Sequence, residues 1–325
     1  MSHLNDKWMQ RIRRDFLFIC LLLLAPYQLM AQADISMATC WYNRANYNPA
    51  AIAHPDYIYL FTNIRKQWMG VEGAPTVFNV QASELNYRYH SAYGISLVSD
   101  KIGESQVINP MLSYAYRIGK TEERWLSFGL AAGIYGRFTD GSLYEAANPA
   151  DPSIYTSLES AIAPDINMGV EFQSPYCILG ASSTHLLSIG KSTSTYLNTN
   201  HLYGYAIYKN TNSEFINYSI GSQIVARNSL LVYEANTSLR FKRATGLTPG
   251  PKEMFDIGIT YRTSKQLTLL LGINLSPNMR VGYAYDQSFV TGYNANTSHE
   301  IMLEYRLPSR RASACNCHNE NYWYF

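Results

Sequence analysis

The chain has 325 residues, of which 14% are aromatic and only 15% are charged, and 27 of them are tyrosine. The formal net charge of +2 falls to zero without residues 1–31, which carry four basic and two acidic side chains and leave 22 of each sign. A neutral chain argues against nucleic acid as a partner, because binding it would need a basic face. Five cysteines are too few and too scattered for a disulfide scaffold.

The first 31 residues have the pattern of a signal peptide. Arg11, Arg13 and Arg14 form a basic start, an apolar run follows over residues 16–25, and small residues precede Gln32. Because a helix needs about 20 apolar residues to cross a bilayer, a membrane anchor is the less favoured alternative. We therefore predict an exported chain that is cleaved near Gln32 and continues with a periplasmic segment over residues 32–56.

The remaining chain reads as a succession of β-strands without a linker or a repeat. Weaker patterns predict nine strands in the N-terminal half, over residues 57–68, 76–89, 93–98, 107–118, 126–138, 166–172, 177–183, 202–208 and 215–227. Strict alternation of apolar and polar residues predicts five more, over residues 235–241, 255–262, 267–274, 281–286 and 300–307. The total is fourteen, in one domain over residues 57–307, with a tail over residues 308–325.

Two folds suit such strands, a secreted β-sandwich and a membrane barrel. No apolar run after the signal approaches 18 residues, so a membrane-spanning chain would have to be a closed barrel. Strands of about 8–10 residues can cross a bilayer when tilted, and abundant tyrosine suits the aromatic girdles of such barrels. We predict an all-β, antiparallel transmembrane barrel of about 14 strands, with one charged set inside: Arg240, Asp256, Arg262, Asp286, Glu304 and Arg306.

The connections differ in length. Residues 263–265 and 276–278 are short and rich in turn-forming residues, whereas residues 139–163, 242–252 and 287–298 form longer loops. Short turns that alternate with long loops are typical of the periplasmic and surface ends of a barrel.

Several patterns resemble sites of chemistry without completing one. The Gly-Lys-Thr and Gly-Lys-Ser strings at 119–121 and 190–192 lack the first glycine of a phosphate-binding loop. Ser298 and Glu300 would lie on one face of a strand and His299 on the other, which excludes a catalytic triad. The acidic residues of the first long loop lack the spacing of a calcium loop; they are Asp140, Glu145, Asp151, Glu159 and Asp165.

A cluster of possible metal ligands occurs in the tail. Cys315, Cys317 and His318 could bind a soft metal, but a structural zinc site would need a fourth ligand. A labile disulfide and an idle tail are the open alternatives. We predict no catalytic residue, no cofactor and no resident metal, and therefore no enzyme.

Five strings of residues occur in chain order: 47–51; 65–70 followed by 73–76; 164–170 continuing through 174–175 and 180–182 to 185–186; 282–286; and 298–303. Together they resemble the PorP/SprF family, which belongs to the type IX secretion and gliding-motility machinery of the Bacteroidetes. The resemblance spans residues 47–307. Ala284 stands where a serine is expected, and the chain runs on past Leu307.

The resemblance implies an outer-membrane barrel that catalyses nothing. Its expected partners are other type IX secretion components, a large secreted surface adhesin and outer-membrane lipid. A pore for small solutes is the alternative function, since fourteen strands can enclose a narrow channel. An outer-membrane hydrolase has no credible set of residues.

Candidate partner-binding residues come from the first two strings. Asn48 and Pro49 initiate a turn, and we expect the hairpin tip over residues 65–75 to be rigid and periplasmic. Arg65 is a forked donor for a partner carboxylate, and Trp68 is a large interface anchor. The alternative is that these residues only build the hairpin. The full candidate set is Asn48, Pro49, Arg65, Gln67, Trp68, Gly70, Gly73 and Pro75.

Overall fold

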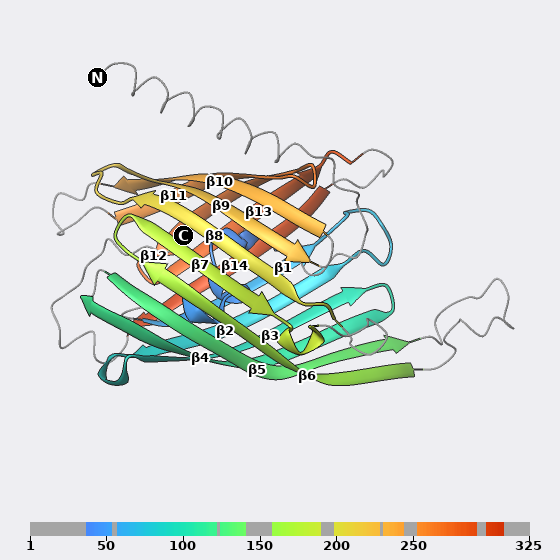
Figure 1. The fold of residues 1–325 in the computed structure, drawn as a ribbon. Helices are drawn as coiled ribbons and strands as arrows, with labels where there is room; N and C mark the ends of the chain where they lie inside the picture. Colours follow the sequence, from blue (N-terminus) through green and yellow to red (C-terminus); the bar gives the residue numbers. More distant parts are fainter. Residues whose placement is uncertain are drawn as a thin grey trace, which may run out of the picture.

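The described residues of the computed structural model form fourteen antiparallel strands that close into one barrel (Figure 1). They are residues 37–53, 57–121, 124–140, 158–189, 198–227, 230–243, 252–290 and 297–308. The strands are β1 (Tyr57–Lys66), β2 (Thr76–Asn86), β3 (Ser91–Ile102), β4 (Ser105–Thr121), β5 (Arg124–Asp140), β6 (Leu158–Gln173), β7 (Cys177–Thr184), β8 (His201–Asn210), β9 (Ile216–Arg227), β10 (Leu230–Arg243), β11 (Lys252–Arg262), β12 (Gln266–Ser276), β13 (Met279–Ser288) and β14 (Thr297–Pro308).

Each strand pairs with its neighbours in sequence, and β1 closes the barrel against β14 from Tyr57↔Pro308 to Lys66↔His299. The predicted fold class and strand number are confirmed. No helix of the described residues is long and apolar enough to cross a membrane. The predicted signal peptide, residues 1–31, and the tail with Cys315, Cys317 and His318 lie outside the described residues.

The two faces of the wall distinguish a membrane barrel from a soluble sandwich. Apolar side chains such as Ile259, Leu269 and Ile301 point outward and are exposed, while Thr260 and Thr268 on the same strands are buried in the lumen. A soluble sandwich would bury its apolar set instead. An apolar exterior around a polar lumen is the pattern typical of a membrane barrel.

The predicted inward charged set is confirmed. Five of its side chains are buried in the lumen, and Arg306 is partly buried beside Glu304. Arg240 and Arg262 face acidic residues of the neighbouring strand, as when Arg240 Nη1 lies 3.0 Å from Glu253 Oε2, whereas Arg306 pairs with Glu304 of its own strand. Paired charges of both signs lower the cost of removing each from water.

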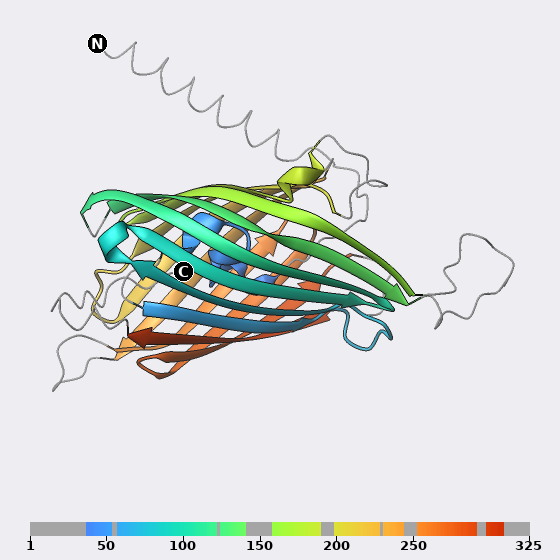
Figure 2. The same ribbon diagram turned by 90° about the horizontal axis from the view of Figure 1, so that it is seen from below.

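The lumen is filled by the chain's own N-terminal part, residues 37–53, which we call the plug (Figure 2). It consists of three short 3-10 turns, η1 (Ala38–Trp41), η2 (Arg44–Asn46) and η3 (Pro49–Ile52). Asn43 and Asn48 precede the second and third turns, and their side chains accept hydrogen bonds from the backbone N–H groups of Ala45 and Ala50. Such caps start a turn without help from the rest of the fold.

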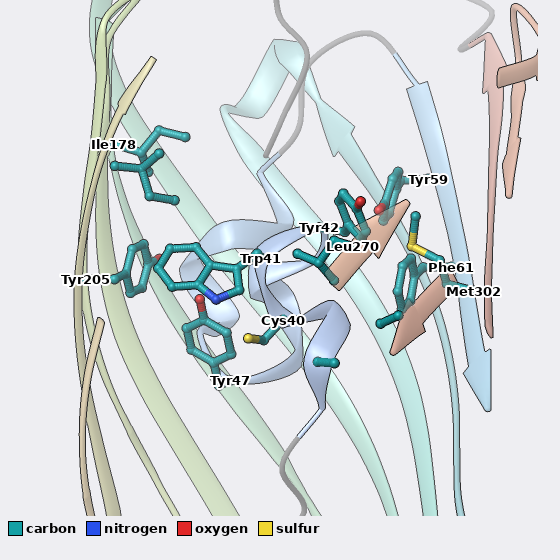
Figure 3. Packing of buried hydrophobic residues seen from close by; sticks show 13 residues of the cluster. Cys40, Trp41, Tyr42, Tyr47, Tyr59, Phe61, Ile178, Tyr205, Leu270 and Met302 are labelled. Atoms are coloured by element: carbon teal, nitrogen blue, oxygen red, sulfur yellow. The ribbon is translucent and has the colours of Figure 1, made fainter. Parts of the chain in front are cut away.

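The plug corrects one expectation. We expected residues 32–56 to form a periplasmic segment, but the described part of that range lies inside the barrel. Its aromatic and apolar side chains pack against the lumenal wall (Figure 3). Trp41 and Tyr47 lie near Tyr205 of β8, and Tyr42 lies near Leu270 of β12. A segment of this composition loses unfavourable contact with water when it enters the lumen.

The two ends of the barrel differ. At one end, called the loop end, lie the connections 67–75, 103–104, 141–157, 185–200, 228–229, 263–265 and 289–296. The opposite end, called the terminal end, holds the start of β1, the end of β14 and connections that include 244–251 and 277–278. From the sequence we expected all long loops at one end and all short turns at the other. That expectation is wrong, because the long loop at 242–252 lies at the terminal end and the short turn at 263–265 lies at the loop end.

Candidate functional site: the plugged lumen

The plug is anchored at its N-terminal side by one carboxylate. Glu300 of β14 is fully buried and accepts hydrogen bonds from the backbone N–H groups of Ala38, at 2.7 Å, and Thr39, at 3.3 Å. The Thr39 hydroxyl donates to the same carboxylate. Asn63 Nδ2 of β1 lies 2.8 Å from it, and Arg65 Nη1 lies 3.3 Å from it. Glu300 thus joins the plug to the seam between β1 and β14.

A second anchor joins the middle of the plug to the opposite wall. Arg44 Nε lies 2.9 Å from Glu171 Oε2 of β6, and both side chains are buried. Burial by itself would lower the pKa of the Arg44 guanidinium, but the Glu171 carboxylate raises that pKa above its usual value. Tyr205 of β8 also donates to Glu171. Glu171 therefore keeps the Arg44 guanidinium charged and holds it against the wall.

A third anchor uses an aromatic residue. The Tyr42 hydroxyl donates to Asp256 Oδ2 at 2.8 Å, and the Arg280 guanidinium lies 4.3 Å from the centre of the Tyr42 ring. Arg280 is itself 2.5 Å from Asp256. Burial and the neighbouring Asp256 carboxylate raise the pKa of the Tyr42 hydroxyl, so it stays protonated as a donor.

Glycines in the wall make room for the plug. A Cβ on Gly129 would lie 2.1 Å from the Ala50 nitrogen, and one on Gly169 would lie 2.0 Å from Asn48 Oδ1. A Cβ on Gly221 would lie 2.5 Å from Cζ3 of Trp41. The paired strands β5 and β6, and the more distant β9, therefore lack side chains where the plug touches them, which shows that plug and wall fit one another.

Asn48 and Pro49 belong to this contact. The Asn48 side chain donates from Nδ2 to the Tyr205 hydroxyl at 2.7 Å and to the Val170 carbonyl at 3.1 Å. Pro49 opens the third turn and is buried. Both candidates therefore hold the plug in the lumen and present no side chain to a partner outside the barrel.

Arg65 is likewise turned inward. It is 2% exposed, with Nη2 2.5 Å from Asp286 Oδ2 and Nη1 3.3 Å from Glu300 Oε2. The structure commits its guanidinium to lumenal carboxylates rather than to a partner's, contrary to the role expected from the sequence. Alternation along β1 gives the reason, because Ile64 faces outward and its neighbour must face the lumen.

The rest of the hairpin forms a rigid tip. The Gln67 N–H donates to the Pro75 carbonyl at 2.9 Å, and Pro75 is buried. Trp68 is 46% exposed at φ 45°, and Gly70 and Gly73 adopt φ 94° and 69°. The tip lies at the loop end, which carries the two longest connections, 141–157 and 185–200. Long connections are typical of the surface end of an outer-membrane barrel, whereas from the sequence we predicted a periplasmic tip.

The five strings that carry the family resemblance form two contact groups in the barrel. Asn48 of the first lies against Gly169 of the third, and Arg65 of the second bonds Asp286 of the fourth and Glu300 of the fifth. Sequence reasoning missed Glu300 as an anchor, because it considered this residue only as part of a triad and of the last family string. It also missed Tyr42, Arg44 and Glu171; of these only Glu171 had a signal in the sequence, as a charged residue between Val170 and Phe172.

Other sites of chemistry remain incomplete in the described residues. His299 lies on the other face from Ser298 and Glu300, as expected, and its Nδ1 is 2.6 Å from the Tyr283 hydroxyl. No group of three His, Cys, Asp or Glu side chains in the described ranges is arranged to hold a metal ion. A cavity of about 90 Å³ lies between the plug and the loop end, with Met37, Tyr47 and His185 in its lining.

Comparison with known proteins gave no match among curated sequences. Among solved structures, the chain is similar to the toluene transporter TbuX of Ralstonia pickettii, with 11% identity over 80% of this chain and 92% of that chain and a TM-score of 0.48. It is also similar to a FadL homologue of Pseudomonas aeruginosa, with 9% identity, coverage of 86% and 99%, and a TM-score of 0.44. A family model described as the type IX secretion system membrane protein PorP/SprF matches residues 29–305. The chain is therefore an integral membrane β-barrel of the outer-membrane type that belongs to the PorP/SprF family of type IX secretion system membrane proteins.

Proposed function

We propose that this protein supports the secretion or surface anchoring of large adhesin-type cargo, as a non-enzymatic outer-membrane component of the type IX secretion system. Family membership over residues 29–305 supports the assignment to that system. The observation that carries the proposal further is the plug, which fills the lumen and is held there by buried carboxylates. A barrel closed by its own chain suits a scaffold that binds other proteins.

The surface that we assign to partners is the tip at residues 67–73. Trp68, Met69 and Val71 are exposed apolar side chains outside the strands. Trp68 also keeps a positive φ, which is costly for a bulky residue and persists where the surroundings require it. The Met69 N–H donates to the Thr297 carbonyl at 3.1 Å, and the Gly103 N–H donates to the Gly73 carbonyl at 2.8 Å. These bonds hold the tip in one conformation, so it loses little conformational entropy when a partner binds.

Gene deletion tests the proposal directly. Loss of one or a few large adhesins from the cell surface is expected, and normal display of every exported protein would contradict it. Trp68→Ala should then weaken recovery of other secretion components with the purified protein, while the barrel still shows heat-modifiable migration. Tyr89→Ala provides the matched control, because Tyr89 is an exposed aromatic residue at the terminal end.

The alternative function is a pore for small solutes, and the cavity at the loop end is the observation in its favour. Conductance in planar bilayers separates the two functions. The intact protein should show no steady conductance, and deletion of residues 37–53 should open the lumen. Steady conductance by the intact protein would favour the pore.

A further inference from the structure

Strand β6 extends far beyond its neighbour on one side. It pairs with β5 along its full length, from Trp125↔Gln173 to Asp140↔Leu158. It pairs with β7 only over residues 168–173, since β7 has 8 residues and β6 has 16. Among the described residues, positions 158–167 of β6 therefore have a strand on one side only. Figures 1 and 2 show β5 and β6 projecting past the wall at the loop end.

The ladder shows which backbone groups point to the open side. At the turn between β6 and β7 the Ser174 N–H donates to the Cys177 carbonyl at 2.8 Å. Hydrogen-bonded and non-bonded pairs alternate along an antiparallel ladder, so even-numbered residues of β6 direct their N–H and C=O groups toward β7. A second bond agrees with this assignment. The Asp140 N–H of β5 donates to the Glu104 carbonyl at 3.1 Å, away from β6, so Leu158, which is paired with Asp140, directs its own backbone groups away from β5.

Ser160 and Ile162 consequently direct their N–H and C=O groups at the open edge. Pro164 is the next even-numbered residue. Proline has no N–H, but at this position the N–H would point to the open side and would bond to neither neighbouring strand, which is the usual place of proline on an edge strand. Nearer the barrel the edge is partly covered, because Leu187 and Ser188 of η6 (Leu186–Ser188) line a small crevice with Ala163 and Pro164. Within the part of the chain that the structure describes, the edge that no other segment covers is therefore residues 158–162.

This edge has few of the features that prevent pairing. Residues 159–162 are exposed, and Ile162 is 64% exposed on the outer face. Residues 158–162 contain one charged residue, Glu159, and no lysine or proline, and the register with β5 has no bulge there. Natural proteins usually protect an exposed edge by such means. Ala161 and Ala163 on the inner face leave space for large side chains of an added strand.

A second copy of the chain does not fit this edge. Two copies in one membrane point the same way, and their β6 edges face each other only after a half-turn about the membrane normal. Each β6 would then run in the same direction and cross the other at roughly twice the strand tilt of about 40°. Strands in a ladder differ by only about 20–25°, so the two edges cannot pair.

We propose that residues 158–162 of β6 accept an extended segment of an exported polypeptide as an additional β-strand. Main-chain hydrogen bonds from Ser160 and Ile162 provide the attachment, and side chains that alternate between the Ile162 face and the Ala161 face provide selectivity. This inference rests on the proposed function, which brings exported polypeptides to this end of the barrel.

The test uses the full-length protein in its native membrane. A photo-crosslinking amino acid at Glu159 should attach to one exported polypeptide, within one extended segment. Ile162→Pro removes an N–H that the β5 ladder does not use and should lower the crosslink yield at least about fivefold, the effect of one net hydrogen bond. Ile162→Ala removes the side chain but keeps the N–H, and should lower the yield less than about twofold. Ser160→Pro should behave like Ile162→Pro.

Each other result overturns the inference. Equal yields for Ile162→Pro and Ile162→Ala, crosslinks within the same chain or to a second copy, or no crosslink at all would show that this edge binds no exported strand. Heat-modifiable migration verifies that each variant still forms a barrel. If gene deletion abolishes adhesin display but Ile162→Pro leaves it normal, the edge inference fails and the proposed function stands. If deletion has no effect on display, the proposed function fails.

Discussion

Glu300→Ala should release the plug from the lumen. The change removes the acceptor of the Ala38 and Thr39 N–H groups and of the Thr39 hydroxyl. A buried donor left without a partner costs about 1–3 kcal/mol, and part of the loss is recovered when the freed segment meets water. Arg65 keeps Asp286 as its partner. We therefore expect the plug to be weakened by about 3 kcal/mol, which is a factor of about 100 in its open population.

Cys40 reports the release. It is buried in the plug, with Sγ 3.9 Å from Gln223 Oε1, and burial raises the pKa of its thiol. A protein with Cys177, Cys315 and Cys317 replaced by serine has Cys40 as its single cysteine after the predicted signal peptide, residues 1–31. Its reaction with a bulky maleimide should be slow in the parent and about 100-fold faster in Glu300→Ala.

Two controls define the result. Glu300→Gln keeps an acceptor of the same size and should accelerate the reaction much less. Glu84→Ala removes an exposed carboxylate of β2 and should have no effect. An unchanged Cys40 reaction rate in Glu300→Ala, with the barrel intact, would refute the assignment of Glu300 as the anchor.

Three further predictions concern fit, lipid contact and pH. Gly129→Val or Gly169→Val should displace the plug at a cost of about 1–3 kcal/mol, measured by the Cys40 reaction, because any Cβ there lies within 2.1 Å of a plug atom; Gly204→Val is the control, since a Cβ at Gly204 meets nothing within 4 Å. Leu269→Arg should destabilise the barrel in lipid by about 2–4 kcal/mol, measured by denaturant unfolding in vesicles, whereas equal stability of Leu269→Arg and Leu269→Ala would place this face away from lipid. Burial raises the pKa of the Cys40 thiol above its ordinary value of 9.0, so this residue's contribution to plug binding is complete below pH 9.0 and is lost as the pH rises above it; protease cleavage of the plug should increase above that pH in the parent and increase less in Cys40→Ala.

The local alternation of apolar and polar residues was sufficient to predict the strands of the barrel wall. Alternation along β11 and β12 predicted their strands to within a few residues and separated the lumenal from the lipid-facing set. The same alternation contained the signal that Arg65 faces the lumen, since Ile64 beside it is apolar. From the sequence we considered Arg65 as part of the hairpin tip because of its closeness to the turn. The face on which a strand residue lies is set instead by whether its position is odd or even along the strand.

The sequence by itself determined the all-β class, the strand number and the charged lumen, because period-two patterning is a local property that each strand carries alone. Only the tertiary structure decided where residues 37–53 lie, because their short capped turns have no periodicity and their partners are distant in the chain. Ala38 and Glu300 are 262 positions apart, and the glycines that receive the plug lie on β5, β6 and β9. The open edge of β6 could not be predicted from the sequence either. It results from the difference in length between β6 and β7, and those lengths are set by the pairing of the strands in the folded barrel.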